Sequence, residues 1–261
     1  ICARGLLTGL NEEANVEQEG ERFMTDKIMH IDGVERRIAS PDDWRLARKD
    51  ILVKEKAHTR AGDKLAAARR RLPWVKVEKE YGFDGPSGRA CLANLFGGCR
   101  QLIVYHHMLK PADPDPCAGC GMVGDQLPHL SHLNQRDTTL VFVSRAPFRE
   151  IEAFKKRMGW TMPWYSTTDS FNPDFDVNGG FGVNVFYRDG EDVYRTYFTT
   201  GRAAEMFGTI WAFLDLTPLG RQEKWEDSPE GTRQTDPYFW WRLHDEYEDR
   251  ANSAPCCGGE S

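Results

Sequence analysis

The segment that decides the fold reads Gln-Leu-Ile-Val-Tyr-His-His-Met at residues 101–108, and continues as Asp-Pro-Cys-Ala-Gly-Cys-Gly at residues 115–121. The first stretch is rich in residues that favour β-strands, and the prolines between the two stretches favour a turn. We expect a helix after this turn, from about residue 117 to about residue 134. A Cys-x-x-Cys pair therefore lies between a strand and a helix start, a position typical of redox-active thiols.

Cys117 and Cys120 are the candidate catalytic residues. The first turn of a helix carries unpaired backbone N–H groups and the positive end of the helix dipole, and both lower the pKa of a thiol. In one interpretation Cys117 is the more exposed thiol and attacks a disulfide or a peroxide, and Cys120 resolves the mixed disulfide. In the opposite register Cys120 is oxidised to a sulfenic acid and Cys117 resolves it. The sequence leaves both registers open.

The segments that follow predict an α/β fold. We expect strands at residues 138–144, 181–187 and 193–198, and a helix with Phe148, Ile151, Phe154 and Met158 on one side. A final amphipathic helix is expected from about residue 202 to about residue 216. The order strand, helix, strand, helix, strand, strand, helix is thioredoxin-like, and right-handed crossovers make its first half parallel.

Three regions are expected along the chain. Residues 1–39 form an N-terminal extension, interpreted as poorly ordered. Residues 40–221 form the thioredoxin-like domain, with a long helix that begins at Ser40-Pro41 and carries an apolar stripe at Trp44, Ile51, His58, Leu65 and Leu72. Residues 222–261 form a C-terminal extension whose aromatic run, residues 238–241, should fold back on the domain or on a second subunit.

Composition narrows the functional class. The chain has 261 residues, 40% of them hydrophobic, and a formal net charge of −6, which argues against a nucleic-acid partner. Its apolar runs are far shorter than the roughly 20 residues that span a bilayer, so no membrane association is expected. Seven cysteines form an odd set that does not suggest a secreted disulfide scaffold. A reducing cytoplasmic location fits this pattern best.

Short stretches spread over residues 40–247 carry a resemblance. They are Glu55–Arg60, Arg70–Trp74, Tyr105–Met108, Cys117–Cys120, Ser144–Pro147, Arg157–Trp160, Pro163–Ser166, Phe171–Phe175 and Leu214–Pro218. In this order they resemble the bacterial domain-of-unknown-function family eight-ninety-nine, thioredoxin-like proteins distantly similar to peroxiredoxins of the AhpC/TSA type. The resemblance implies the fold, but it leaves the activity undefined because the family's role is itself unknown.

Two departures separate the chain from better-known relatives of this fold. It lacks the peroxiredoxin spacing Pro-x-x-x-Thr-x-x-Cys, although residues 85–158 are similar to the peroxiredoxin order of elements. It also lacks a thioredoxin-type proline before the strand near Gly182-Val183. Cations that could stabilise a thiolate are Arg145, at a strand end, and Arg195, in the predicted hairpin. For each arginine taken alone, a structural salt bridge is the more common role.

A zinc site is the competing interpretation. Cys117, Cys120, His129 and His132 supply the ligand types of a tetrahedral zinc site, with a shorter gap than zinc fingers use. His106 and His107 point to opposite faces of their strand, so at most one of them can face the thiols. In the redox interpretation no cofactor is needed.

Two functional hypotheses follow. The first is a thiol-disulfide oxidoreductase or peroxidase-like reductase that acts on a thiol, disulfide or peroxide substrate. The alternative is a non-enzymatic module that binds zinc or a protein partner. A third interpretation is a ligand pocket walled by Trp160, Trp164, Phe171 and Phe175, although core packing is the default for each. Analogy with other proteins of this fold also leaves room for a homodimer.

Overall fold

The computed structural model describes residues 27–248. These residues divide into two units, residues 27–61 with 229–231 and residues 62–228 with 232–248. Cys2, Cys256 and Cys257 lie outside the described residues, as do the first 26 residues of the predicted N-terminal extension. Both candidate cysteines belong to the second unit.

The first unit contains a hairpin that the sequence analysis did not predict. Strands β1 (Lys27–Ile31) and β2 (Val34–Ile38) pair antiparallel, and Ile31 is opposite Val34. The two-residue turn Asp32-Gly33 has φ values of 53° and 79°. Such left-handed values are what an Asp-Gly hairpin turn requires. The expectation of poor order was therefore wrong for residues 27–38.

Helix α1 (Pro41–Arg69) begins where the sequence predicts. The Ser40 hydroxyl accepts a hydrogen bond from the backbone N–H of Asp43 at 3.1 Å, which caps the first turn. The predicted apolar stripe lies on the helix, but no residue of α1 is buried, and Trp44 is 61% exposed. Local sequence signals therefore define this helix, and at its last turn the Arg69 guanidinium lies 5.0 Å from the centroid of the Tyr197 ring.

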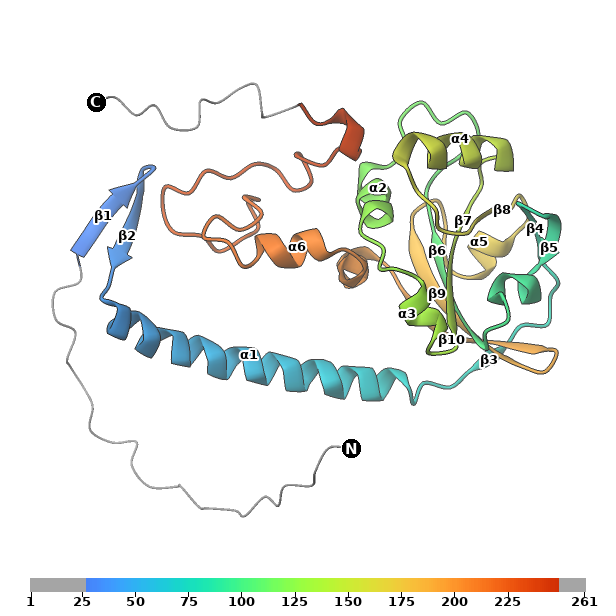
Figure 1. Cartoon of the computed structure of the whole chain (residues 1–261), viewed down its shortest axis with the longest axis horizontal. Coiled ribbons are helices and arrows are strands. Elements are labelled where there is room, and N and C mark those ends of the chain that lie inside the picture. The colour runs from blue at the N-terminus through green and yellow to red at the C-terminus, as the bar shows by residue number, and fades with distance from the viewer. Residues whose placement is uncertain (1–26, 249–261) are drawn as a thin grey trace, which may run out of the picture. The chain divides into compact units, whose positions relative to one another are not determined.

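The second unit is built on an eight-stranded sheet with the order β3-β10-β9-β6-β7-β8-β4-β5. The strands are β3 (Val75–Lys76), β4 (Gly82–Gly85), β5 (Gly88–Cys91), β6 (Gln101–His106), β7 (Thr138–Ser144), β8 (Trp164–Ser166), β9 (Gly182–Asp189) and β10 (Asp192–Thr199). Strand β6 runs parallel to β7 and antiparallel to β9, and β9 pairs antiparallel with β10. The central order β10-β9-β6-β7, with a helix between β6 and β7, is that of a thioredoxin-like fold (Figure 1).

The helices of this unit are α2 (Ala118–Asp125), α3 (Ser131–Asn134), α4 (Phe148–Met158), α5 (Phe171–Asp174) and α6 (Thr209–Leu214). The single helix predicted for residues 117–134 is wrong: it is divided into α2 and α3, and Pro128 in the connection disfavours a continuous helix. The final predicted helix is also divided, into a 3₁₀ turn at Gly201–Phe207 and α6. Gly208 between them is extended, and a Cβ there would lie 2.0 Å from the Trp211 ring.

Two hydrophobic cores lie on opposite faces of the sheet. On one face, Tyr105 packs with Phe142 and Trp164 and with side chains of α2, α4 and α6. On the other face, Leu102 and Val104 pack with α5 and with the 3₁₀ turn at Leu92–Phe96. Alternation along β6 therefore directs Tyr105 to the face that carries the Cys-x-x-Cys helix.

Within residues 27–248, no helix combines the length and the apolar composition needed to cross a bilayer.

Candidate dithiol site

Cys117 is the N-cap of α2. Its carbonyl oxygen accepts the first helical hydrogen bond, from the N–H of Gly121 at 3.0 Å, and its Sγ accepts one from the N–H of Cys120 at 3.4 Å. The thiol sulfur thus takes the place that a serine or aspartate oxygen takes at an ordinary helix start. A sulfur in this position faces the unpaired donors of the first turn, where negative charge is stabilised.

The two thiols have opposite acidities. The Cys120 thiol donates a hydrogen bond to Cys117 and, together with the N–H groups of Cys120 and Gly119, lowers the pKa of Cys117 to about 6 against the opposing effect of burial. Burial raises the pKa of Cys120 well above its usual value, and the neighbouring Cys117 raises it further. Cys117 is half-buried, while Cys120 is 1% exposed. At neutral pH the pair therefore consists of one thiolate that a reagent can approach and one protonated thiol behind it.

Tyr105 links the buried thiol to the sheet. Its hydroxyl donates a hydrogen bond to Cys120 Sγ at 3.4 Å, and this contact lowers the pKa of Cys120, partly offsetting the effect of burial. Because β6 positions Tyr105 and α2 positions the sulfur, the contact fixes the strand and the helix relative to each other. The hydroxyl can stabilise Cys120 when that thiol loses its proton.

The C-terminal extension lies along α2. A Cβ added to Gly119 would lie 2.5 Å from the Trp241 ring, and one added to Gly121 would lie 2.4 Å from Leu243. At the other end of the helix, His244 Nδ1 is 2.7 Å from an Asp125 carboxylate oxygen. The glycines of α2 thus leave room for the extension, and the prediction that the aromatic segment folds back on the domain is confirmed (Figure 1).

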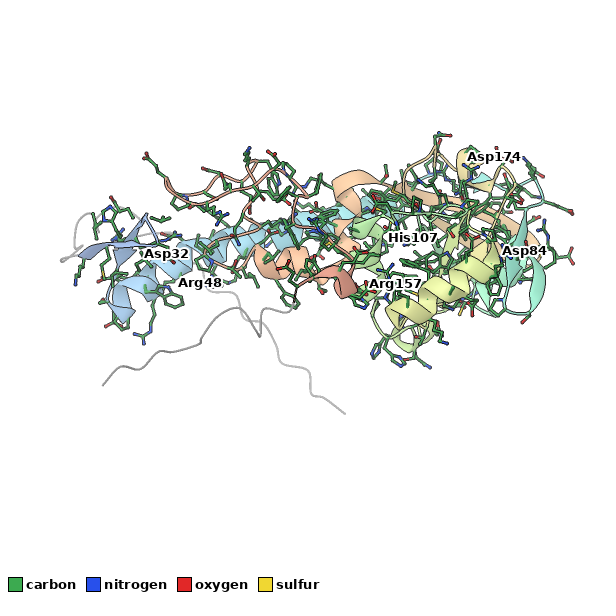
Figure 2. All side chains as sticks on the ribbon, turned by 90° about the horizontal axis from the view of Figure 1, so that it is seen from above. Asp32, Arg48, Asp84, His107, Arg157 and Asp174 are labelled. Carbon is green, nitrogen blue, oxygen red and sulfur yellow. The ribbon has the colours of Figure 1, made fainter. Side chains whose placement is uncertain are left out.

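The described part of the C-terminal extension, residues 222–248, covers α2 and is called the covering segment. Ion pairs hold both of its ends. Arg157 of α4, labelled in Figure 2, donates two hydrogen bonds to Asp245, at 2.7 and 2.9 Å, and one to Glu246 at 3.0 Å. At the other end Arg221, whose side chain is 6% exposed, donates to both carboxylate oxygens of Asp215 and to Glu205. Two parallel hydrogen bonds from a planar guanidinium to one carboxylate fix the orientation of both side chains and also pair their charges.

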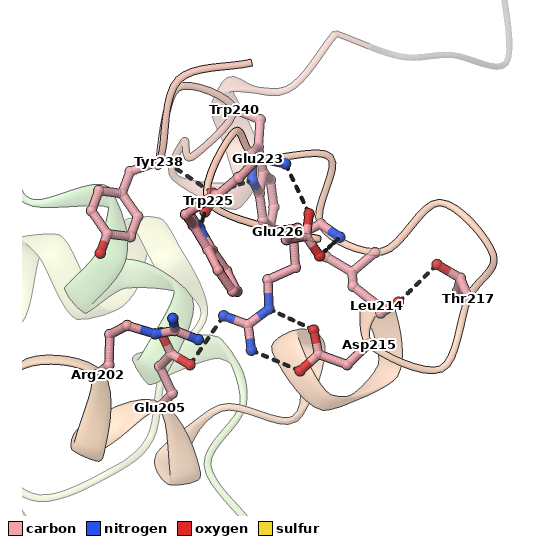
Figure 3. A network of polar contacts seen from close by, with 11 residues as sticks. Arg202, Glu205, Leu214, Asp215, Thr217, Glu223, Trp225, Glu226, Tyr238 and Trp240 are labelled. Atoms are coloured by element: carbon pink, nitrogen blue, oxygen red, sulfur yellow. Dashed lines mark hydrogen bonds and ion pairs between the residues drawn. The ribbon is translucent and has the colours of Figure 1, made fainter. Parts of the chain in front are cut away.

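Glu223 organises the aromatic residues of the same segment. Its buried carboxylate accepts hydrogen bonds from the indole N–H groups of Trp225 and Trp240 and from the backbone N–H of Tyr238 (Figure 3). Three donors from different parts of the extension therefore converge on one carboxylate. The ring of Tyr238 in turn packs against that of Trp241, with 4.5 Å between ring centroids.

A cavity of about 280 Å³ opens beside the dithiol. Both cysteines line it, and so do Tyr105, Met108, Phe181, Trp211, Tyr238 and Trp241. Its walls come from the strand ahead of the helix, the start of β9, α6 and the covering segment. The candidate site therefore combines a thiol of lowered pKa with a small, mostly apolar pocket.

Neither predicted cation is brought to the thiols. Arg195 donates to Asn184 and Asp176, and lies over two phenylalanine rings. Arg145 lines a different cavity, together with Lys110 and Asp169. No hydrogen bond or ion pair joins either arginine to Cys117 or Cys120. The helix start and the thiol pair itself supply the stabilisation that the sequence analysis had assigned to these side chains.

The four-residue zinc set is not assembled. His129 Nδ1 lies 2.7 Å from the Ser131 hydroxyl, and its ring is 6.1 Å from that of His132. Across residues 27–248, no three His, Cys, Asp or Glu side chains lie close enough together to hold a metal ion. Cys117 and Cys120 are therefore not joined by His129 and His132 in a common site.

The two strand histidines are structural. His106 is buried between Asn172 and Asn184, each 3.0 Å from a ring nitrogen, and burial lowers its pKa to about 4. His107 packs on the opposite face against Trp164 and accepts a hydrogen bond from the N–H of Leu109, and burial lowers its pKa to about 3. Both rings are neutral at pH 7. The alternation that the sequence predicts is confirmed.

The sequence analysis missed the residues that shape the pocket. It had considered Trp160, Trp164, Phe171 and Phe175 as a wall, but Trp164 and Phe171 are fully buried core residues. Phe181, Trp211, Tyr238 and Trp241 help to form the actual wall, and they are separated from the cysteines by at least 60 positions. One signal was available: three glycines in an eight-residue helix indicate that another segment packs closely against it.

Comparison with solved structures finds low-similarity matches. Plasmodium yoelii thioredoxin peroxidase I is 14% identical with a TM-score of 0.35, over 52% of this chain and 84% of that one. Xanthomonas campestris bacterioferritin comigratory protein is 16% identical with a TM-score of 0.33, over 48% and 87%. A putative protein disulfide isomerase from Bacteroides thetaiotaomicron is 18% identical with a TM-score of 0.34, over 52% and 89%. The thioredoxin-like fold is therefore identified from the strand order alone.

No curated protein matches the chain. A family model does match it, over residues 33–247, and that range contains the dithiol, the cavity and the covering segment. The chain belongs to the family described as bacterial protein of unknown function (DUF899).

Proposed function

We propose that this protein is a thiol-disulfide oxidoreductase in which Cys117 attacks and Cys120 resolves. The observation that carries the proposal is the asymmetry of the pair: a half-buried thiol of low pKa at a helix start, hydrogen-bonded to a buried thiol of high pKa. The first is suited to nucleophilic attack, and the second stays protonated until it is needed.

The exchange proceeds in two steps. The Cys117 thiolate attacks one sulfur of a disulfide R–S–S–R′, forms a mixed disulfide with R–S, and releases R′–S⁻, which takes up a proton. Cys120 then loses its proton and attacks Cys117 Sγ, which forms the Cys117–Cys120 disulfide and releases R–S⁻. Two electrons pass from the protein dithiol to the substrate, which becomes two thiols. An external thiol reductant restores the dithiol for another turnover.

The residues around the pair support each step. The N–H of Cys120 stabilises the attacking thiolate. The Tyr105 hydroxyl, 3.4 Å from Cys120 Sγ, stabilises the second thiolate as it forms. Disulfide exchange is favoured over peroxide reduction because neither Arg145 nor Arg195 contacts the thiols to stabilise a departing alkoxide or hydroxide.

Trapping of the mixed disulfide tests the proposal. The reduced protein is treated with one equivalent of 4,4′-dithiodipyridine, and the products are mapped by peptide mass spectrometry. We expect the wild type to lose two hydrogens at Cys117 and Cys120, and Cys120→Ser to retain a thiopyridyl group on Cys117. Cys91→Ser removes an exposed cysteine outside the site and serves as the matched control. An adduct that accumulates on Cys120 in the Cys117→Ser variant as fast as on Cys117 would contradict the assigned order.

A further inference from the structure

The cavity beside the dithiol has the size of a small organic group. Its volume is about 280 Å³, while a cavity of roughly 150 Å³ is large enough to bind benzene. One or two rings or branched alkyl groups therefore fit next to Cys117. A folded polypeptide chain does not fit in such a space unless the covering segment moves.

The chemistry of the walls favours an uncharged occupant. The charged residues that line the cavity are Arg202 and Glu205, and they pair with each other at 3.0 Å. Arg202 also stacks on Trp225 at 4.0 Å, and Glu205 accepts a second ion pair from Arg221. Both charges are therefore already satisfied by the protein. An anionic substrate would lose hydration in this pocket without gaining a partner, and the Cys117 thiolate would repel it.

The covering segment is fixed close to the helix. Trp241 lies against Gly119 within the Cys-x-x-Cys motif, and Leu243 lies against Gly121. Before these contacts the Glu223 carboxylate holds the Trp240 indole, and after them Arg157 holds Asp245 (Figures 2 and 3). The extended groove that a disulfide-bearing polypeptide would need beside α2 is therefore already occupied by the chain's own extension.

We infer, on the basis of the proposed exchange activity, that the substrate is a low-molecular-weight, uncharged disulfide with an aromatic or branched aliphatic substituent, and that Trp241 determines this specificity. In the reaction R is then the apolar group held in the pocket. Cys117 forms the mixed disulfide with R–S, Cys120 displaces it, and two R–SH molecules leave. Protein disulfides and anionic disulfides are excluded, the first by the covering segment and the second by the lack of a free cationic partner.

Single-turnover kinetics with three oxidants tests the inference. The full-length reduced protein is mixed with 4,4′-dithiodipyridine, which is uncharged at neutral pH, with the doubly anionic 5,5′-dithiobis(2-nitrobenzoate), or with insulin. Each rate constant is divided by that of the same oxidant with reduced glutathione, which removes differences in intrinsic reactivity. We expect the normalised rate with dithiodipyridine to exceed the other two by at least about tenfold, a difference of about 1.4 kcal/mol in transition-state binding.

Two variants assign the preference to the covering segment. Trp241→Ala removes the ring, and Gly119→Ala displaces it by a methyl group, so both should reduce the preference for dithiodipyridine several-fold. Trp74→Ala, which removes a half-exposed indole that packs on Tyr187 and Tyr194, is the matched control and should retain the preference. If Trp241→Ala does not fold, Gly119→Ala provides the same test.

The possible failures can be told apart. If the wild type reduces none of the three oxidants through Cys117, the proposed function is wrong. If it reduces all three at equal normalised rates, or if both variants retain the full preference, exchange stands and the substrate assignment is overturned. Cumene hydroperoxide serves as a fourth oxidant, and a rate constant for it larger than that for every disulfide would contradict the proposed exchange function itself.

Discussion

Helix α1 is 29 residues long and contains no buried residue, whereas five of the eight residues of α2 are buried. The first is made of strong helix formers with an N-cap and ion pairs such as Arg48–Glu55. The second contains three glycines, each of which costs about 1 kcal/mol relative to alanine in a helix. Local propensity therefore supports α1, whereas α2 depends on packing from the core and the covering segment. The reactive thiols are carried by the helix that tertiary contacts hold in place.

The two regions should differ most in how their histidines change the free energy of unfolding with pH. His106 and His107 enter the core just before α2, and burial lowers their pKa values to about 4 and about 3. In the unfolded chain a histidine titrates near pH 6.5, so the unfolded state binds protons that the folded state does not. Their stabilising effect is complete above about pH 6.5, and falls by up to about 1.4 kcal/mol per pH unit for each histidine as the pH drops below that value.

Urea unfolding between pH 7 and 4.5 measures this loss. His107→Asn should remove about half of the change in the free energy of unfolding with pH, because one of the two buried imidazoles is gone. His58→Ala, an exposed position in α1, is the matched control and should leave the slope unchanged. A free energy of unfolding that is flat across this range would contradict the assignment of both imidazoles as neutral and buried.

Removing one carboxylate should lower the free energy of unfolding several times more in the covering segment than in α1. Glu223→Ala leaves the indole donors of Trp225 and Trp240 without an acceptor, and should lower the free energy of unfolding by about 3 kcal/mol. Glu55→Ala breaks only the exposed pair with Arg48 in α1, which contributes about 0–1 kcal/mol. Chemical denaturation of both variants checks the difference. Equal losses would mean that Glu223 does not organise the covering segment.

An added methyl group in α2 should destabilise the protein. A Cβ at Gly124 would lie 2.6, 2.7 and 2.9 Å from three atoms of the Trp160 ring, which is held by a hydrogen bond to Asp125. Because the hydrogen bond to Asp125 holds the Trp160 ring in place, Gly124→Ala should cost about 1–3 kcal/mol. Thermal unfolding monitored by tryptophan fluorescence measures this cost. A stability equal to that of the wild type would show that the helix and Trp160 are loosely packed.

The same substitution in α1 should have the opposite and smaller effect. Gly62 has an ordinary helical backbone and no neighbouring atom within 4 Å of an added Cβ. Gly62→Ala should therefore stabilise the protein by about 0.5–1 kcal/mol, through a gain in helix propensity. The midpoint of urea unfolding should rise without a change in slope. A decrease would reveal a partner surface on this part of α1.

The same division explains which parts of the structure could be predicted from the sequence. Helix α1, strands β6 and β7 and the β9–β10 hairpin have local signals, and their predictions agree with the structure. The predicted end of α2 lies too far along the chain, because Pro128 was not taken as a helix break. The sequence near α2 also gives little guidance, because the first half of the helix packs against residues more than 100 positions away. The Asp32-Gly33 hairpin had a local signal that was overlooked.

The site was predicted in part for the same reason. The Cys-x-x-Cys pair is found from its spacing because a helix start supplies the chemistry locally. The pocket is not, since Phe181, Trp211 and Trp241 reach it from three separate segments. Arg195 was a reasonable candidate by charge, but pairing with Asp176 and Asn184 keeps it at another position. In the proposed function, long-range packing therefore decides the specificity of the site, while sequence spacing indicates only its reactive atoms.

The pH dependence of alkylation at each cysteine of the reduced protein distinguishes the two thiols most directly. Reaction with iodoacetamide, mapped by mass spectrometry, should label Cys117 with a midpoint near pH 6, since its thiolate fraction rises as the pH passes its pKa of about 6. Cys120 should stay unlabelled well above neutral pH because its thiol is buried and protonated. Equal midpoints for the two thiols, or faster labelling of Cys120, would contradict the account of one attacking and one resolving cysteine.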